Sequence, residues 1–273
     1  MAAEMTLREH LNELRVRVMH IVIAVIAITI FTMTFDLRPA EFGGLTLAYP
    51  YPDAIHNLSA RIMLYMQDTL LPDNVTLVQT APGQAFFAQM YVSVLAGIIG
   101  SMPVIVKEIS GFISPAISAQ ARKSISRVVV PAIALFVAGV AFSYVVVVPF
   151  VLDFLYQYGE AIGVVPLFNI TDFISFVLQF LLGFGISFEL PILMYGIALT
   201  DTMSPTFWRN NFRYAVIIIV IFGAVITPDG SGITMWFVAL PMLALYAAGM
   251  AAVEARARRI ARQEAAMAGG GNK

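Results

Sequence analysis

The residues that could do chemistry in this chain are carboxylates in two different settings. Glu9, Glu13 and Glu108 lie in or next to segments rich in Lys and Arg. Glu189 lies instead in the second half of an apolar run, residues 171–200. An exposed carboxylate near arginines is usually a solvated ion pair that contributes little, but two carboxylates that meet can grip a guanidinium through bidentate hydrogen bonds. The first set therefore indicates recognition of a cation, if the chain brings Glu13 and Glu108 together.

An ionised Glu189 is energetically costly within this apolar run. A charged side chain within a membrane-spanning helix costs ~2.5–3.5 kcal/mol on insertion scales, so it persists only beside a partner, beside water or as the neutral acid. Pro191 cannot donate a hydrogen bond to the carbonyl of Ser187, and we expect a kink beside Glu189. Either a protonated Glu189 bonds to Ser187 or a backbone oxygen, or it makes a polar contact inside a groove; we favour the contact.

The sequence lacks the residue patterns of known catalytic sites. Its three histidines, His10, His20 and His56, form no cluster in a membrane span, and there is no cysteine. Metalloprotease and P-loop motifs are absent, as are paired intramembrane aspartates. No Ser, His and Asp fall at one depth of a membrane. We therefore expect no enzymatic activity, no metal and no cofactor.

The composition is that of a helical membrane protein. The 273 residues are 59% hydrophobic and only 12% charged, with a mean hydropathy of +0.83. A soluble domain has roughly 25% charged residues. The apolar runs are continuous rather than alternating, which excludes a membrane barrel. The net charge of −1 indicates no nucleic-acid partner.

The apolar runs predict six transmembrane helices in an all-α protein. They are expected at about 18–35, 84–106, 128–152, 171–200, 214–227 and 233–253. Residues 1–253 then form a single domain, and 254–273 form a basic, partly disordered cytoplasmic tail. Span 214–227 is short, because fourteen residues rise only ~21 Å against a hydrocarbon core of ~30 Å. Either its ends lie further out, or the bilayer is thinner around it.

The connection between the first two spans, residues 36–82, is expected to form a helical extracytoplasmic cap. Its YPYP sequence at 49–52 is typical of a turn, and Asp53 is expected to cap an amphipathic helix. The apolar stripe of that helix is Ile55, Leu58, Ile62, Met66 and Leu70. Residues 75–79 are expected to be extended.

The distribution of basic residues predicts the orientation. Fourteen of the sixteen Lys and Arg residues flank the spans on one side, and only Arg38 and Arg61 lie on the other. Because basic residues concentrate in cytoplasmic loops, both termini are expected to be cytoplasmic.

Six stretches of the chain carry a likeness to a known family. They are HLNELRVR at 10–17, PGQAFFAQMYVSVLAGIIGSMPVIVKEISGFISPAI at 82–117, VVVPFVLDF at 146–154, FGISFELP at 184–191, ITPDGSG at 226–232 and ALP at 239–241. Together, in this order and at this spacing, they resemble TatC, the multispanning subunit of the twin-arginine translocase. The resemblance covers nearly the whole chain.

The resemblance implies a fold, a function and partners. It implies a concave, glove-like bundle of six spans, in a multi-pass protein of the cell membrane that contacts lipids. It implies recognition of the twin-arginine signal peptides of folded cargo, and export driven by the proton-motive force. It also implies TatA- and TatB-like single-span partners, and a homo-oligomer within a larger complex.

The resemblance also implies two sets of site residues. The signal-peptide-binding residues are Glu13, Leu14, Arg15, Arg17, Glu108, Phe112 and Pro115. The concave face that contacts partner helices holds Glu189 and Gln179. In one respect the chain departs from the family, which places a loop glutamate where this chain has Ala121. Our hypothesis is that Glu108 replaces that missing acid.

Two other functions are compatible with parts of the sequence. A small proton-coupled secondary transporter would use Glu189 as its coupling acid, and would need a second buried polar group. Gln179, Ser187 and Ser175 are the candidates for that group. No internal repeat is visible, which counts against a transporter with inverted repeats. An intramembrane enzyme ranks last, since no nucleophile and base share one depth.

Overall fold

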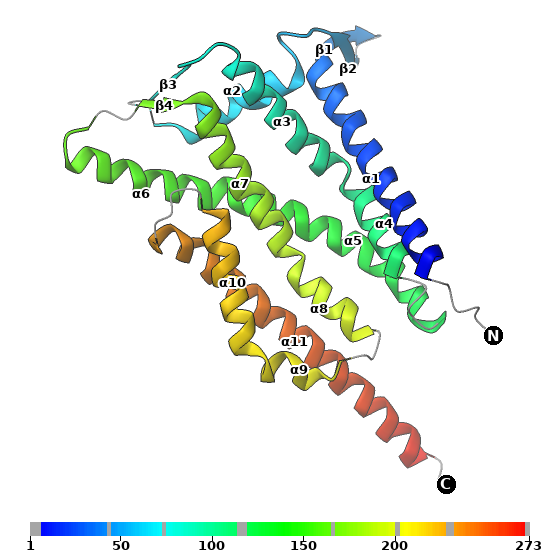
Figure 1. Ribbon diagram of the computed structural model, residues 1–273. Helices are drawn as coiled ribbons and strands as arrows, with labels where there is room; N and C mark the ends of the chain where they lie inside the picture. The colour runs from blue at the N-terminus through cyan, green and yellow to red at the C-terminus, as the bar shows by residue number, and fades with distance from the viewer. Residues whose placement is uncertain are drawn as a thin grey trace. The chain divides into compact units, whose positions relative to one another are not determined.

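The structure is a computed structural model, and two compact units make up the chain. The described residues are 7–42, 45–72, 75–113, 119–164, 167–199, 203–227 and 232–270. Unit 1 consists of residues 1–112 and 141–182, and unit 2 of residues 113–140 and 183–273. Each unit is mostly helical (Figure 1).

In unit 1, helix α1 (Leu7–Thr34) packs along α3 (Gln84–Gly100), as Figure 1 shows. A glycine on α3 allows the close approach, since a Cβ at Gly97 would lie 2.8 Å from the carbonyl oxygen of Val25. After Ser101 the chain bends by 54° into α4 (Met102–Ile113). Pro103 stands in the first turn of α4, where its missing N–H costs least. The bend directs α4 back toward the start of α1 (Figure 1).

The all-α prediction is wrong in the connection that follows α1. Strands β1 (Phe35–Phe42) and β2 (Leu45–Pro52) form an antiparallel hairpin in which Phe35 pairs with Pro52. Asp53 N–H donates to the Thr34 carbonyl at 2.9 Å, which fixes the base of the hairpin to the end of α1. The YPYP segment is therefore strand and not turn. A two-stranded ribbon has only edges, and edges tolerate proline.

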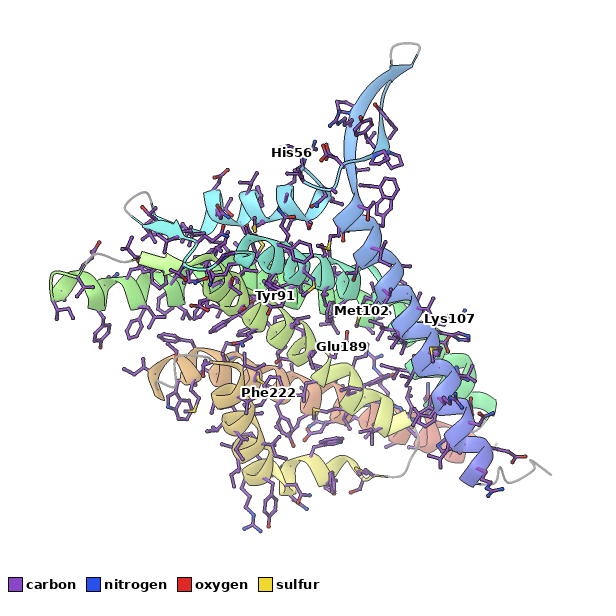
Figure 2. All side chains as sticks on the ribbon, turned by 45° about the horizontal axis from the view of Figure 1, so that its top comes forward. His56, Tyr91, Met102, Lys107, Glu189 and Phe222 are labelled. Carbon is purple, nitrogen blue, oxygen red and sulfur yellow. The ribbon has the colours of Figure 1, made fainter. Side chains whose placement is uncertain are left out.

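The cap helix is α2 (Leu58–Leu70), and it begins later than Asp53 predicted. Its N-cap is Asn57, whose Oδ1 accepts from the Ala60 N–H at 2.9 Å. Asp53 instead accepts from the N–H groups of Ile55 and His56 in the preceding turn, where Figure 2 labels His56. These two bonds favour the ionised carboxylate and hold the pKa of Asp53 below its usual value.

Two further features complete unit 1. The segment expected to be extended contains β3 (Thr76–Val78), which pairs in parallel with β4 (Leu167–Asn169). A π-helical turn, η2 (Ser143–Val147), leads into α6 (Val148–Ala161), and α7 (Ile170–Phe188) begins in this unit. The core is apolar, and its fully buried side chains include Val92, Val148, Val151, Ile174 and Phe180.

In unit 2, α8 (Leu190–Leu199) and α10 (Phe212–Ile226) both pack against α11 (Gly232–Gly270). Two glycines set these distances. A Cβ at Gly249 would lie 3.1 Å from Pro191 Cα, and one at Gly223 would lie 3.1 Å from the Met235 carbonyl oxygen. The unit also contains most of α5 (Ala119–Phe142) and the short α9 (Pro205–Asn210).

Among the described residues, four helices are long and apolar enough to cross a membrane, or five if α3 and α4 form one bent span. Helix α10, in the region of the fifth predicted span, has 15 residues and is shorter than this. The count of six, the glove-like shape and the cytoplasmic termini stay predictions. Where a tail was expected to begin at 254, α11 continues to Gly270.

Candidate functional site

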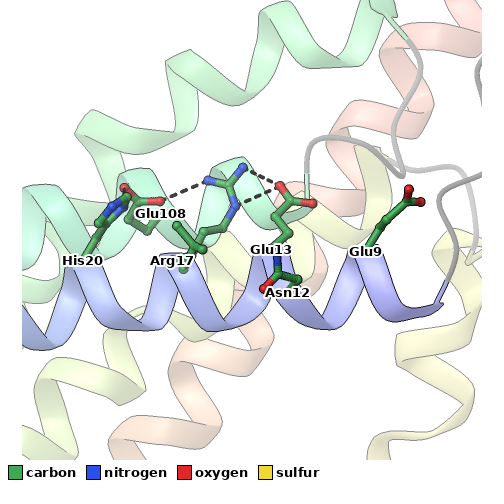
Figure 3. A pocket seen from close by; sticks show the side chains of 7 residues that line it. Glu9, Asn12, Glu13, Arg17, His20 and Glu108 are labelled. Carbon is green, nitrogen blue, oxygen red and sulfur yellow. Dashed lines mark hydrogen bonds and ion pairs between the residues drawn. The ribbon is translucent and has the colours of Figure 1, made fainter.

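One face of α1 carries the polar residues of the candidate site. Glu9, Glu13, Arg17 and His20 follow one another at spacings of four, four and three residues, which places them in one row. With Asn12, Val16 and Glu108, they line an open hollow of about 520 Å³ (Figure 3). Every lining residue belongs to unit 1.

Arg17 lies at the centre of the hollow and joins two carboxylates that are far apart in the sequence. Its Nε and Nη2 donate to Glu13 Oε1 at 3.0 and 2.6 Å, and its Nη1 donates to Glu108 Oε2 at 3.1 Å. The first pair is within α1, whereas Glu108 is 91 residues away on α4. The two predicted acids therefore meet on one guanidinium, as the dashed lines in Figure 3 show.

Glu108 is the more buried of the two acids, with 12% of its side chain exposed. Its second oxygen, Oε1, lies 3.2 Å from His20 Nδ1. Such burial is tolerable for a carboxylate only when its oxygens have partners. The bend at Ser101 directs α4 so that Glu108 reaches these partners on α1.

Gly111, one turn after Glu108 on α4, makes room for the guanidinium. A Cβ at this position would lie 2.9 Å from Arg17 Cζ and would collide with Nη1. Next to it, the ring of Phe112 stacks on His10, with ring centroids 4.5 Å apart and planes at 21°. The absence of a side chain at 111 is thus part of the site.

The remaining predicted residues lie elsewhere. Leu14 and Arg15 are exposed on α1 and do not line the hollow. Pro115 lies outside the described residues. Glu9 was named with Glu13 and Glu108 as a candidate carboxylate but was not among the predicted signal-binding residues, and Asn12, His10 and His20 were not predicted at all.

The second candidate site is Glu189 in unit 2, at the break between α7 and α8 (Figure 2). The expected interruption is present: Glu189 N–H donates to the Ile186 carbonyl, three residues back, and α8 begins at the next residue. Glu189 Oε1 is buried and has no hydrogen-bond partner among the described residues. Ser187 does not serve it, since the Ser187 hydroxyl donates to the Gly183 carbonyl at 2.5 Å.

Gln179 lies in neither of these two sites, and the described residues offer no metal site. Gln179 is exposed on the part of α7 that belongs to unit 1. Within the described ranges, no group of three or more His, Asp and Glu side chains could hold a metal ion.

Comparison with known proteins decides the family. The model of the family described as "Sec-independent protein translocase protein (TatC)" matches residues 9–241. This chain belongs to the TatC family. A TatC from Cenarchaeum symbiosum is 50% identical over 257 residues, covering 94% of this chain and 97% of the relative. A TatC from Carboxydothermus hydrogenoformans is 34% identical, covering 89% and 90%.

A solved structure agrees with the family assignment. The crystal structure described as "Twin Arginine Translocase Receptor- TatC" superposes with a TM-score of 0.73 at 26% identity, covering 90% of this chain and 98% of the other. The chain is thus a membrane-embedded component of the Sec-independent protein translocase, and this TatC is not an enzyme. These comparisons do not favour the transporter alternative.

Proposed function

We propose that this TatC is the receptor subunit that binds twin-arginine signal peptides at the cytoplasmic face of the cell membrane. The carrying observation is the bridge that Arg17 makes between Glu13 and Glu108. It demonstrates that two carboxylates from distant segments present their oxygens to one guanidinium, the group that such a signal supplies twice. Guanidinium and carboxylate pair through two parallel hydrogen bonds, which gives geometric selectivity as well as energy.

Glu108 then acts as the second acid in place of the loop glutamate, where this chain has Ala121. Its contact with Arg17, whose other partner is Glu13, supports that role. Phe112 beside His10 offers an aromatic surface to the apolar segment that follows the signal's arginines. Leu14, Arg15 and Pro115 stay predicted contacts of the bound signal.

Assembly is the second part of the proposal. TatA- and TatB-like single-span proteins join the bound receptor, further copies of the chain enter the complex, and folded cargo crosses at the expense of the proton-motive force. Glu189 supports a partner contact, because its buried Oε1 lacks a donor among the described residues. A helix from another chain would supply one. Gln179, exposed on α7, stays a predicted member of the partner-contacting face.

Site-directed crosslinking tests the receptor assignment. A photoreactive twin-arginine signal peptide is added to the full-length protein in lipid nanodiscs, with the crosslinker next to the arginine pair. Crosslinks to α1 and α4 are expected, and Glu13→Gln should abolish them. Glu108→Gln should weaken them by about tenfold or more, since each hydrogen bond to a charged group is worth ~1.5–3 kcal/mol.

Two results would count against this assignment. If the crosslinks persist unchanged in Glu13→Gln, Glu13 does not bind the signal peptide. Crosslinks that are lost in Glu13→Gln but unchanged in Glu108→Gln would leave Glu13 in place and remove Glu108 as the second acid.

A further inference from the structure

We propose that the corner between α9 and α10 in unit 2 binds the headgroup of an anionic phospholipid through Arg209 and Arg213. Basic side chains, aromatic rings and an exposed apolar helix face meet at this corner. Together they match a ligand that has an anionic head and apolar tails. This lipid site is separate from the signal site, which belongs to unit 1.

The basic side chains that the structure describes in unit 2 all lie in two short segments. They are Arg209 and Arg213 at the corner, and Arg256, Arg258, Arg259 and Arg262 on α11, against which α9 packs (Figure 1). Glu254, an acid of the same unit, pairs with Arg258 at 3.4 Å. Within the described part of the chain, Arg209 and Arg213 form no ion pair, so their charges are available to an anion from outside.

Arg213 is held beside an aromatic ring and not beside an acid. Its Nη2 donates to the Tyr214 hydroxyl at 3.0 Å, and its Cζ lies 4.7 Å from the centroid of the Tyr214 ring. This contact orients the guanidinium and leaves its charge in place. The stability of α10 does not account for Arg213, because a positive charge in the first turn of a helix is unfavourable with the helix dipole. A bound anion would offset that cost.

Aromatic side chains fix the corner against α11. The Tyr246 hydroxyl donates to the Trp208 carbonyl at 2.8 Å, and the Trp208 and Tyr246 rings meet edge to face with centroids 6.3 Å apart. The ring of Phe212 lies 5.8 Å from that of Tyr246. Tryptophan and tyrosine are enriched where a bilayer meets water, at the level of the headgroups. The corner is therefore suited to the depth at which lipid phosphates lie.

An apolar face of α10 begins directly after the corner. Ile217, Ile218 and Ile221 are each more than half exposed, and they follow Tyr214 at spacings of three, four and seven residues, which places them on its side of the helix. A lipid whose head binds Arg213 can lay its acyl chains along this face. A soluble anion or an acidic protein surface would leave the face uncovered, so the ligand that fits is an anionic phospholipid.

The two tryptophans of the chain allow lipid binding to be measured at two places in unit 2. Trp236→Phe leaves Trp208, the neighbour of Arg209, as the reporter. Trp208→Phe leaves Trp236, which is 43% exposed near the start of α11. Each full-length protein is reconstituted in mixtures of phosphatidylglycerol and phosphatidylcholine, with one of the two lipids brominated. Bromine on the acyl chains quenches nearby tryptophan, so quenching against composition gives the affinity for the anionic lipid relative to the neutral one.

At Trp208 we expect phosphatidylglycerol to bind about fivefold more tightly than phosphatidylcholine, the effect of roughly one basic residue on an anionic headgroup. In about 1 M salt, where the Debye length is about 3 Å, the preference should largely disappear. Arg209→Gln/Arg213→Gln should also abolish it, whereas Arg209→Lys/Arg213→Lys keeps both charges and should retain it. At Trp236 neither lipid should be preferred.

The matched control is Arg8→Gln/Lys107→Gln, which removes two exposed basic side chains from unit 1 and should leave the preference at Trp208 unchanged. Equal binding of the two lipids at Trp208, or an equal preference at Trp236, would overturn the proposal. So would a preference that survives Arg209→Gln/Arg213→Gln, or one that the control also abolishes, since it would then follow the net charge of the chain. Absence of quenching at Trp208 by both lipids would overturn it as well, because the corner would not face the bilayer.

Discussion

Glu108 in unit 1 and Glu189 in unit 2 are both partly buried carboxylates of apolar helices, and they differ in what surrounds their oxygens. Glu108 Oε2 accepts from Arg17, and Oε1 lies within hydrogen-bond distance of His20. Glu189 Oε1 has no partner among the described residues. A buried polar atom that lacks a partner costs ~1–3 kcal/mol, so the fold alone does not account for Glu189.

This difference separates two kinds of binding. At Glu108, a ligand must exchange with groups that already hydrogen-bond to the acid. At Glu189, a ligand supplies a donor that the chain lacks, so binding relieves a cost that is already present. The first arrangement suits recognition of a particular cation, and the second suits a lasting contact with a partner helix.

The largest expected effect on signal-peptide binding comes from removing both acids of the first site, Glu13 and Glu108. In Glu13→Gln/Glu108→Gln, binding of the Arg-Arg signal peptide should fall at least about 100-fold, because neither carboxylate remains to accept from a guanidinium. Fluorescence anisotropy with the protein in nanodiscs measures this.

Glu254→Gln is the matched control for that double variant. Glu254 pairs with Arg258 at 3.4 Å on the exposed part of α11, and exposed pairs contribute about 0–1 kcal/mol. Comparable losses in the control and the double variant would indicate a general effect of charge and not a site.

Substitution of Glu189 should weaken partner association and leave signal binding unchanged. Glu189→Ala should reduce copurification of TatA- and TatB-like partners by about 3- to 30-fold, the range that ~0.6–2 kcal/mol for a polar contact in a membrane allows. Glu189→Gln, which keeps a carbonyl acceptor, should retain most of it. Signal binding should not change in either variant.

Ser187→Ala is the control at the same turn, because the Ser187 hydroxyl already bonds to its own helix. Undiminished partner recovery with Glu189→Ala would show that the unpaired oxygen has another purpose.

Disturbing the contact between α1 and α3 should affect signal binding at the first site and not partner association at Glu189. Gly97→Ala places a Cβ 2.8 Å from the Val25 carbonyl oxygen and closer still to the Thr29 hydroxyl, so α1 and α3 must separate. We expect a loss of about 1–3 kcal/mol in stability, seen as a lower Tm in detergent, together with weaker signal binding. Gly196→Ala, where a Cβ meets nothing within 4 Å, should leave both unchanged, and an unaltered Tm in Gly97→Ala would contradict the packing described here.

The smallest expected effect is on the stability of the hairpin, where Asp53 accepts hydrogen bonds from nearby N–H groups. Its pKa is lowered by the N–H groups of His56 and Ile55, so its contribution to stability is complete above the ordinary Asp pKa of about 3.9 and is lost as the pH falls through the lower native value. The protection factors of amides in β1 and β2, which are exchange rates corrected for the intrinsic pH dependence, should therefore stay constant from pH 7 to about pH 5 and fall below about pH 4. Asp53→Asn should lower the protection factors throughout this range, and a steady fall between pH 7 and 5 in the wild type would point to another group.

The sequence predicted several features in which one residue's chemistry acts locally. Pro191 lacks an N–H, and the interruption at Glu189 follows from that alone. Long apolar runs predicted the helices that could span a membrane, because backbone groups in lipid must bond within their own segment. The i, i+4 spacing of Glu13 and Arg17 is compatible with their pairing within α1, although the sequence analysis did not predict this pair.

Other features depended on contacts between distant segments. The bridge from Arg17 to Glu108 requires the bend at Ser101 and the empty space at Gly111, and neither is encoded near Arg17. The hairpin was missed because its prolines suggested a turn, although at an unpaired edge they cost no hydrogen bond. Asn57 is the N-cap instead of Asp53 because Asp53 Oδ1 already accepts from the N–H groups of Ile55 and His56 in the preceding turn.

Helix α11 has 39 residues, and at ~1.5 Å per residue it is a rod of about 58 Å. A hydrocarbon core accommodates about 30 Å of it, so nearly half its length must project into water or headgroups. Arg256 Nη1 donates to the Ala198 carbonyl at the end of α8, which braces the rod where the projecting part begins. The basic residues Arg258, Arg259 and Arg262 of this second half are therefore held on a helix that is continuous with the apolar span.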